Sequence, residues 1–342
     1  ASGDAILVGG GTTPANNSGV VANLGTITAG DAGIHVTGNN AGTLPTWVAS
    51  NPQAAALGVR NAFIANAGAI RSTGHGIQID GANGSAEVAG IVYNDGAIVA
   101  GDSGIVVGDA NYGVIVNYTE GSISATNSGI LVAGANFGGI GNAGTIETNN
   151  GHGIFVVGDN SGQILNAATG TIDAASDGIF VGGGNAGATE ANSPARIVNA
   201  GTIDATYSGI HVALDNGGFI TNTGRVTAGT NGIQIDGANT GSIVSNGTAE
   251  TAAQITAGDQ GISVGSDNSG SITNGLYSTI TARSTGIYVQ GDNATAASIS
   301  NTGAIVSTGA VGIAVESANA GTIANSGTVR ASSAGIYVGN GN

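Results

Sequence analysis

The feature that most constrains this chain is a repeat that runs from one end to the other. Each repeat contains three short apolar segments separated by turns rich in Gly, Asn and Ser, as in Asn142-Ala-Gly-Thr-Ile-Glu, Gly153-Ile-Phe-Val and Gly162-Gln-Ile-Leu. The basic period is 23 to 25 residues, with larger steps where segments are inserted. Such a period is typical of solenoids, in which each repeat buries its apolar side only by stacking on its neighbours.

The apolar segments have the alternation of β-strands. In Gly-Ile-x-Val, the Ile and Val side chains point to one face and the residue between them points to the other. β-Branched side chains suit an inner wall because they pack well on a pleated surface. We therefore predict an all-β, single-domain parallel β-helix (β-solenoid), with three short strands in each coil of about 23–25 residues and coils stacked about 4.8 Å apart.

Equivalent positions in successive repeats predict three inward columns. The first strand supplies Ile27, Ile70 and their equivalents; the second supplies pairs from Ile34/Val36 to Ile336/Val338; the third supplies Ile64, Ile91, Ile115 and their equivalents. A Gly precedes every second-strand pair. Gly is expected where the chain turns sharply or adopts positive φ.

An Asn follows the third strand in nearly every repeat. Its amide can bond to the coils above and below, and Asn-x-Gly also suits the left-handed geometry of a tight turn. We predict a structural Asn ladder that includes Asn142, Asn166, Asn199 and Asn222. The other expected members are Asn23, Asn66, Asn94, Asn117, Asn246, Asn274, Asn301 and Asn325.

No linker or break in composition divides the chain, so residues 1–342 are predicted to form one β-solenoid domain. The largest departure from the repeat, at about 44–61, contains Pro45, Trp47 and Pro52. We expect it to be a surface insertion with room for a short helix. Smaller excursions are expected at 188–194 and 247–253.

Composition excludes several classes of function. The chain has 6 Lys+Arg residues, all of them Arg, against 21 Asp+Glu, for a net charge of −15, so nucleic acid is not an expected partner. The absence of Cys removes disulfides, iron–sulfur clusters and cysteine nucleophiles. The longest apolar runs are far shorter than the roughly 20 residues of a membrane span, so no membrane span is expected.

Three acidic side chains occupy the position after the first-strand Ile on successive repeats: Glu147, Asp173 and Asp204. We expect a vertical column of carboxylates, which fits a cation site, with calcium as the candidate, or a sugar-binding face. A solvated polar column is the alternative interpretation. No other cofactor is expected.

Catalysis is not expected. The Arg residues are scattered and Lys is absent, which argues against the cleft of a polysaccharide lyase. The four His residues, His35, His75, His152 and His211, have neither metal-ligand nor triad spacing. We interpret them as exposed polar side chains.

The outward position of the second strand is apolar on four consecutive repeats. The residues are Val106, Leu131, Phe155 and Phe180, and Tyr288 and Tyr337 continue the column intermittently. An apolar column on an outer wall indicates an interface with another molecule. The alternative is coverage by a neighbouring loop of the same chain.

The motifs Asn-x-Gly-x-Ile, Gly-Ile-x-Val and Gly-x-Ile, repeated through essentially the whole chain, resemble the β-helical passenger regions of bacterial autotransporters and large surface adhesins. The resemblance implies export, a secreted or cell-surface location, and roles in adhesion, aggregation or biofilm-like surface coats. The small residues Ala1-Ser2-Gly3 fit a processed end, and the chain is expected to be a passenger fragment or a secreted subunit.

Two hypotheses of function follow. The first is an extracellular structural or adhesive β-solenoid of a bacterial surface, which assembles end to end into a filament or acts as an adhesin. Its partners would be further copies of itself, other surface proteins or glycans, since uncapped strand edges pair readily with another chain. The alternative is a polysaccharide-binding or polysaccharide-cleaving β-helix that uses Glu147, Asp173 and Asp204.

Overall fold

The computed structural model describes residues 3–9, 14–42, 62–187 and 195–341, and within these ranges it contains strands and turns but no helix. The chain divides into two compact units, residues 1–158 and 159–342, and each is described by itself. The predicted insertion at 44–61, with its short helix, and the excursion at 188–194 lie outside the described residues. The prediction of a single domain stays a prediction.

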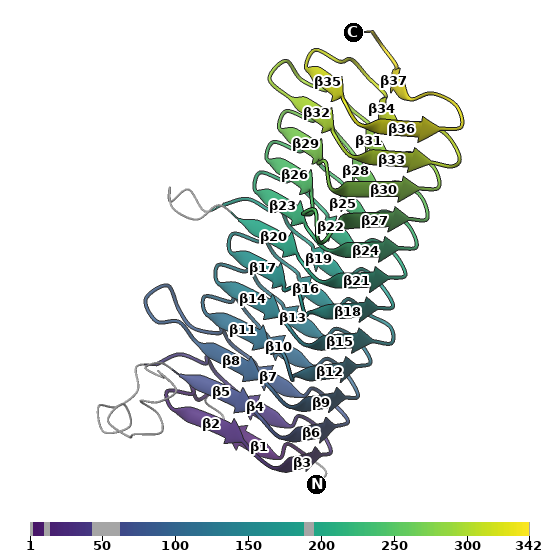
Figure 1. Ribbon diagram of the computed structural model, residues 1–342. Coiled ribbons are helices and arrows are strands. Elements are labelled where there is room, and N and C mark those ends of the chain that lie inside the picture. The colour runs from purple at the N-terminus through teal and green to yellow at the C-terminus, as the bar shows by residue number, and fades with distance from the viewer. Residues whose placement is uncertain (1–2, 10–13, 43–61, 188–194, 342) are drawn as a thin grey trace. The chain divides into compact units, whose positions relative to one another are not determined.

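The described part of the first unit contains five complete coils and one additional strand (Figure 1). The first-strand sheet consists of β3 (Thr26–Ala29), β6 (Ala69–Ser72), β9 (Ala97–Ala100), β12 (Ser122–Ala125) and β15 (Thr145–Thr148). The second-strand sheet consists of β1 (Ile6–Val8), β4 (Ile34–Val36), β7 (Ile77–Ile79), β10 (Ile105–Val107), β13 (Ile130–Val132) and β16 (Ile154–Val156). The third-strand sheet consists of β2 (Val20–Asn23), β5 (Phe63–Asn66), β8 (Ile91–Asn94), β11 (Val114–Asn117) and β14 (Gly139–Asn142).

The described part of the second unit contains seven coils of the same design. Its first-strand sheet consists of β18 (Thr171–Ala174), β21 (Thr202–Ala205), β24 (Arg225–Ala228), β27 (Ala253–Ala257), β30 (Ser278–Ala282), β33 (Ala304–Ser307) and β36 (Thr328–Ala331). Its second-strand sheet consists of β19 (Ile179–Val181), β22 (Ile210–Val212), β25 (Ile233–Ile235), β28 (Ile262–Val264), β31 (Ile287–Val289), β34 (Ile313–Val315) and β37 (Ile336–Val338). Its third-strand sheet consists of β17 (Gln163–Asn166), β20 (Arg196–Asn199), β23 (Phe219–Asn222), β26 (Ser242–Ser245), β29 (Ser271–Asn274), β32 (Ser298–Asn301) and β35 (Thr322–Asn325).

Strands of neighbouring coils pair in parallel and in register. In the first unit Ile105 pairs with Ile130, and Ile130 pairs with Ile154. In the second unit Ile210 pairs with Ile233 in the same way. The predicted fold class, a parallel β-solenoid with three strands per coil, is therefore confirmed for both units.

The core of each unit is the stack of inward Ile and Val side chains. Ile130, Ile154 and Ile210 are all 0% exposed. Burying one such side chain contributes about 1.5–3 kcal/mol relative to leaving it in water, so the regular columns offset the entropy cost of a Gly-rich chain. The last coil differs, because the Ile336 side chain is 44% exposed.

The third-strand column departs from the prediction in one coil of the first unit. Val92, which is 0% exposed, pairs with the inward Ile64, whereas Ile91 pairs with the outward Phe63. The inward residue always lies two positions before the ladder Asn, here Asn94. Ile91 therefore faces outward, and the prediction that it belongs to the core is wrong.

The Gly before each second-strand pair has a different role from the one expected. Among the described residues only Gly9, Gly84 and Gly341 have positive φ, and no residue other than Gly does, so the Asn turns are not left-handed either. A Cβ on Gly33 would collide with Ile70 Cγ2 and lie 2.7 Å from the carbonyl oxygen of Gly76. These Gly residues are required because neighbouring coils approach closely there.

Candidate functional site

In the first unit, only part of the predicted outer column of the second strand is accessible to a partner molecule. Val106 pairs with Leu131, and Leu131 pairs with Phe155, as expected for a column. Val106, however, is only 8% exposed, and the ring of Phe155 lies 4.8 Å from the ring of His152. Side chains of the same unit therefore cover part of this column.

In the second unit the outer column is not continuous. Phe180 pairs with His211, and the two rings lie 4.8 Å apart. Gln234 and Ser263 then occupy the next two outward positions before Tyr288 is reached. Tyr337, on the last coil, is 42% exposed.

The three predicted acids fall into both units. Asp173 and Asp204 pair in register on adjacent strands of the second unit, and both side chains are exposed. Glu147 is also exposed, but it lies in the first unit, where its strand neighbour is Ser124. Within the described residues no group of three or more His, Asp or Glu side chains is arranged to hold a metal ion.

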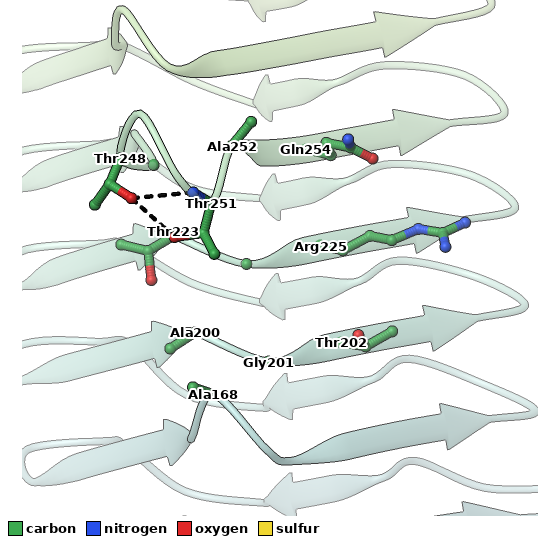
Figure 2. A pocket seen from close by; sticks show the side chains of 12 residues that line it. Ala168, Ala200, Gly201, Thr202, Thr223, Arg225, Thr248, Thr251, Ala252 and Gln254 are labelled. Atoms are coloured by element: carbon green, nitrogen blue, oxygen red, sulfur yellow. Dashed lines mark hydrogen bonds between the residues drawn. The ribbon is translucent and has the colours of Figure 1, made fainter.

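A groove of about 530 Å³, lined by Ala, Gly and Thr residues with Arg225 and Gln254, lies beside the first-strand sheet of the second unit (Figure 2). Thr202, Arg225 and Gln254 form one wall on three successive strands. The opposite wall is the excursion predicted at 247–253. A 2.9 Å hydrogen bond between the hydroxyl groups of Thr248 and Thr251 closes the turn of this excursion. Arg225 is the only charged residue among those that line the groove.

Two His side chains bridge three successive coils. His35 Nδ1 lies 2.8 Å from Asp4 Oδ2 and its Nε2 lies 3.0 Å from Asp80 Oδ2. In the second unit His211 Nδ1 lies 3.4 Å from Asp177 Oδ2, and its Nε2 lies 3.0 Å from an Asp236 oxygen. These contacts were not predicted, since the His residues were interpreted as exposed.

The Asp–His–Asp bridges favour the protonated imidazole. Burial lowers the pKa of His211, but the hydrogen bonds and charges of Asp177 and Asp236 outweigh burial and raise this pKa above its ordinary value of 6.5. Burial likewise lowers the pKa of His35, but the hydrogen bonds and charges of Asp4 and Asp80 outweigh burial and raise it above 6.5. A raised pKa in the folded state adds stability that is fully present below pH 6.5 and is lost as the pH rises through the raised value.

The predicted Asn ladder is a chain of buried amide hydrogen bonds. Asn166 Nδ2 donates to Asn199 Oδ1 at 2.8 Å, and Asn199 Nδ2 donates to Asn222 Oδ1 at 2.8 Å. In the first unit Asn117 Nδ2 donates in the same way to Asn142 Oδ1, also at 2.8 Å. A buried polar group costs free energy unless it is paired, so each Asn depends on the coils beside it.

The ladder is interrupted at Ser245. Asn222 Nδ2 donates to Ser245 Oγ at 3.3 Å, and Ser245 Oγ in turn lies 2.8 Å from Ser278 Oγ. The Ser side chain does not reach the next member of the ladder, and Asn274 Oδ1 is buried without a hydrogen-bond partner. Asn246, which the sequence pattern assigned to the ladder, is exposed.

Sequence analysis missed a second Asn ladder at the turn between the second and third strands. In the second unit Asn185, Asn216 and Asn239 are each 0% exposed, and their amides are joined by hydrogen bonds of 2.7 Å. In the first unit Asn40, Asn83 and Asn111 are joined by bonds of 2.8 Å. A signal was present, because in most coils an Asn stands six residues before the ladder Asn, as Asn216 does before Asn222.

Sequence analysis also missed an exposed apolar surface on the third-strand sheet of the first unit. We call it the apolar face and define it by the outward residues of β2, β5, β8, β11 and β14. These residues are Val20, Ala22, Phe63, Ala65, Ile91, Tyr93, Val114, Val116, Gly139 and Gly141. In the second unit, nine of the fourteen equivalent residues are polar or charged.

Fold and surface together define a β-solenoid repeat protein with distinct outer faces. No family model, curated protein or solved structure matches the chain. Among the described residues there is no helix of the length and apolarity needed to cross a membrane.

Proposed function

We propose that the chain is a non-enzymatic structural or adhesive β-solenoid, exported to the surface of a bacterium as its resemblance to autotransporter passengers and adhesins implies. The coils keep the same buried columns and Asn ladders, while their outer residues change from coil to coil. This combination suits a scaffold that holds contact surfaces at fixed spacing.

Self-assembly end to end is the form of this proposal that we favour. The observation that carries it is the regular register of the coils: strands pair in parallel with their equivalents in the next coil, as Ile105 does with Ile130 and Ile210 with Ile233. At the edge of the last described coil, Ile323, Ile336 and Val338 line a groove of about 410 Å³. A coil from a second copy would pair with this edge in the same register and bury these side chains.

Electron microscopy and sedimentation velocity test the filament. We expect the purified protein to form long particles whose amount rises with concentration, and Ile336→Asp to abolish them by placing a charge in the open edge. Leu276→Asp is the matched control, because Leu276 is an exposed side chain of the same unit away from this edge. Short particles at every concentration, or fibres unaffected by Ile336→Asp, would refute the filament.

Polysaccharide binding is the second candidate function. It is supported by the groove in Figure 2, whose walls carry Thr202, Arg225 and Gln254, and by the exposed pair Asp173 and Asp204 on the same sheet. Sugars are bound by side chains that combine hydrogen-bond donors and acceptors, which Thr, Gln and carboxylates provide. Replacing Asp173, Asp204 and Glu147 with Asn or Gln should then abolish binding on a glycan array, and an unchanged binding profile excludes their role.

A further inference from the structure

The apolar face is unusual for an outer surface of a strongly acidic chain. Its ten outward positions carry no charged side chain, although the whole chain has a net charge of −15. Val20 is 45% exposed and Val114 is 39% exposed. Ala22 is also exposed, Ala65 is buried, and the other six residues of the face are half-buried. Monomeric soluble proteins rarely expose a contiguous apolar patch of this kind without a partner.

Aromatic rings extend the apolar face beyond its strands. Along the face the rings of Phe63 and Tyr93 lie 6.2 Å apart, and those of Tyr93 and Tyr118 lie 5.6 Å apart. At the opposite edge Tyr112 and Phe137 stack at 4.9 Å with an interplanar angle of 16°. Exposed aromatic residues in well-packed clusters are typical of the centres of protein interfaces.

The face has the size and charge that suit a second copy of the same chain. It spans five strands, about 20 Å at the spacing of neighbouring strands, and about 20 Å along the chain from Tyr112 to Tyr118. Two such faces would bury roughly 800 Å², which is below the size of stable interfaces and corresponds to a weak dimer. Two chains that each carry a charge of −15 repel one another. A face whose outward positions are uncharged, with the Asp95 carboxyl hydrogen-bonded to Tyr93 beside it, is therefore where they can meet.

From these observations we propose that the chain dimerises face to face through the apolar face of its first unit. The contact is isologous, with the two third-strand sheets packed against each other about 10 Å apart, as in other sheet-on-sheet interfaces. It is a lateral contact that does not depend on the proposed end-to-end assembly. Because the remaining surface is acidic, added salt weakens the repulsion between copies and strengthens the dimer.

Sedimentation equilibrium tests the dimer on the Ile336→Asp background, in which end-to-end assembly is blocked. We expect the mean mass to rise from 32.5 kDa toward twice that value with concentration, and to rise further in high salt. Val114→Glu places a charge on β11 within the face and should weaken dimerisation at least tenfold. Ser298→Glu adds the same charge at an equivalent outward position of the second unit and should leave the dimer intact.

Circular dichroism establishes that both variants are folded. A mass of 32.5 kDa at every concentration would overturn the proposal and would indicate that another part of the chain or a different partner covers the face. A dimer that Val114→Glu does not weaken would also overturn it. Filament formation by the unmodified protein is scored separately, so failure of the lateral dimer and failure of end-to-end assembly are distinguishable.

Discussion

Removal of a single ladder amide should destabilise the coils on both sides of it. Asn199 is 0% exposed, and its side chain accepts from Asn166 Nδ2 and donates to Asn222 Oδ1, both at 2.8 Å. It also donates to the carbonyl oxygen of Arg225 at 3.0 Å. Asn199→Ala removes all three bonds and deprives the buried Asn222 Oδ1 of its donor in the ladder.

The size of the effect follows from these bonds. A buried polar atom that loses its partner costs about 1–3 kcal/mol, and each further lost bond contributes about 1 kcal/mol. We therefore expect Asn199→Ala to lower the free energy of unfolding by about 3–5 kcal/mol. Asn199→Asp should be worse at pH 7, because it places a carboxylate oxygen against two acceptors, and it should recover in acid, where the protonated group can donate.

Hydrogen exchange measured by mass spectrometry is the suitable assay, because a solenoid loses stability locally, between neighbouring coils. Peptides from 196–228 should lose protection about 140- to 3,700-fold in Asn199→Ala, since about 1.4 kcal/mol corresponds to a factor of ten. Asn246→Ala is the matched control, because Asn246 is an exposed Asn of the same unit, and it should change protection little. Equal effects of the two substitutions, or an Asn199→Asp protein more stable than Asn199→Ala at pH 7, would refute the reasoning.

Three further predictions concern other contacts of the second unit. His211→Gln should lower the urea midpoint relative to the parent protein most strongly below pH 6.5, with the difference shrinking as the pH rises above that value; a difference that grows with pH would contradict the raised pKa. Ser245→Asn combined with Ser278→Gly should restore the missing ladder donor and stabilise the protein by about 1 kcal/mol in urea unfolding, whereas a loss of stability would show that this coil cannot hold the Asn. Gly232→Ala should destabilise by about 1–3 kcal/mol, since its Cβ would lie 2.6 Å from the carbonyl oxygen of Gly261; an unchanged melting temperature would contradict the close approach of these coils.

The repeating pattern made most of the fold predictable. The second strand alternates Ile, a variable residue and Val, and its inward side chains from Ile34 to Val315 are 0% exposed. One position of register changes the face on which a side chain lies, so a strict alternation specifies the inward column. The apolar pattern failed only where it was ambiguous, as at Ile91-Val92, where both residues are β-branched and the distance to Asn94 decides which is buried.

For some residues, the sequence pattern did not reveal the structural role that requires them. A Gly that avoids a collision and a Gly that adopts positive φ look the same in a sequence, and Gly33 turned out to be of the first kind. Ser245 and Asn246 are adjacent, and only the pairing of Ser245 with Asn222 shows which of them continues the ladder. The Asp–His–Asp bridge of His211 joins residues from three coils, so no local spacing predicts it.

The candidate surfaces were harder to predict for a physical reason. The inward side chains and the ladder amides must be repeated in every coil, because each one completes the bonds of its neighbour, and they therefore dominate the sequence pattern. Outward residues carry no such requirement and can differ between coils without loss of stability. Information about partners thus lies in differences between coils, such as the apolar outward Val residues of β11 compared with the polar outward Ser residues of β32, and not in the repeat itself.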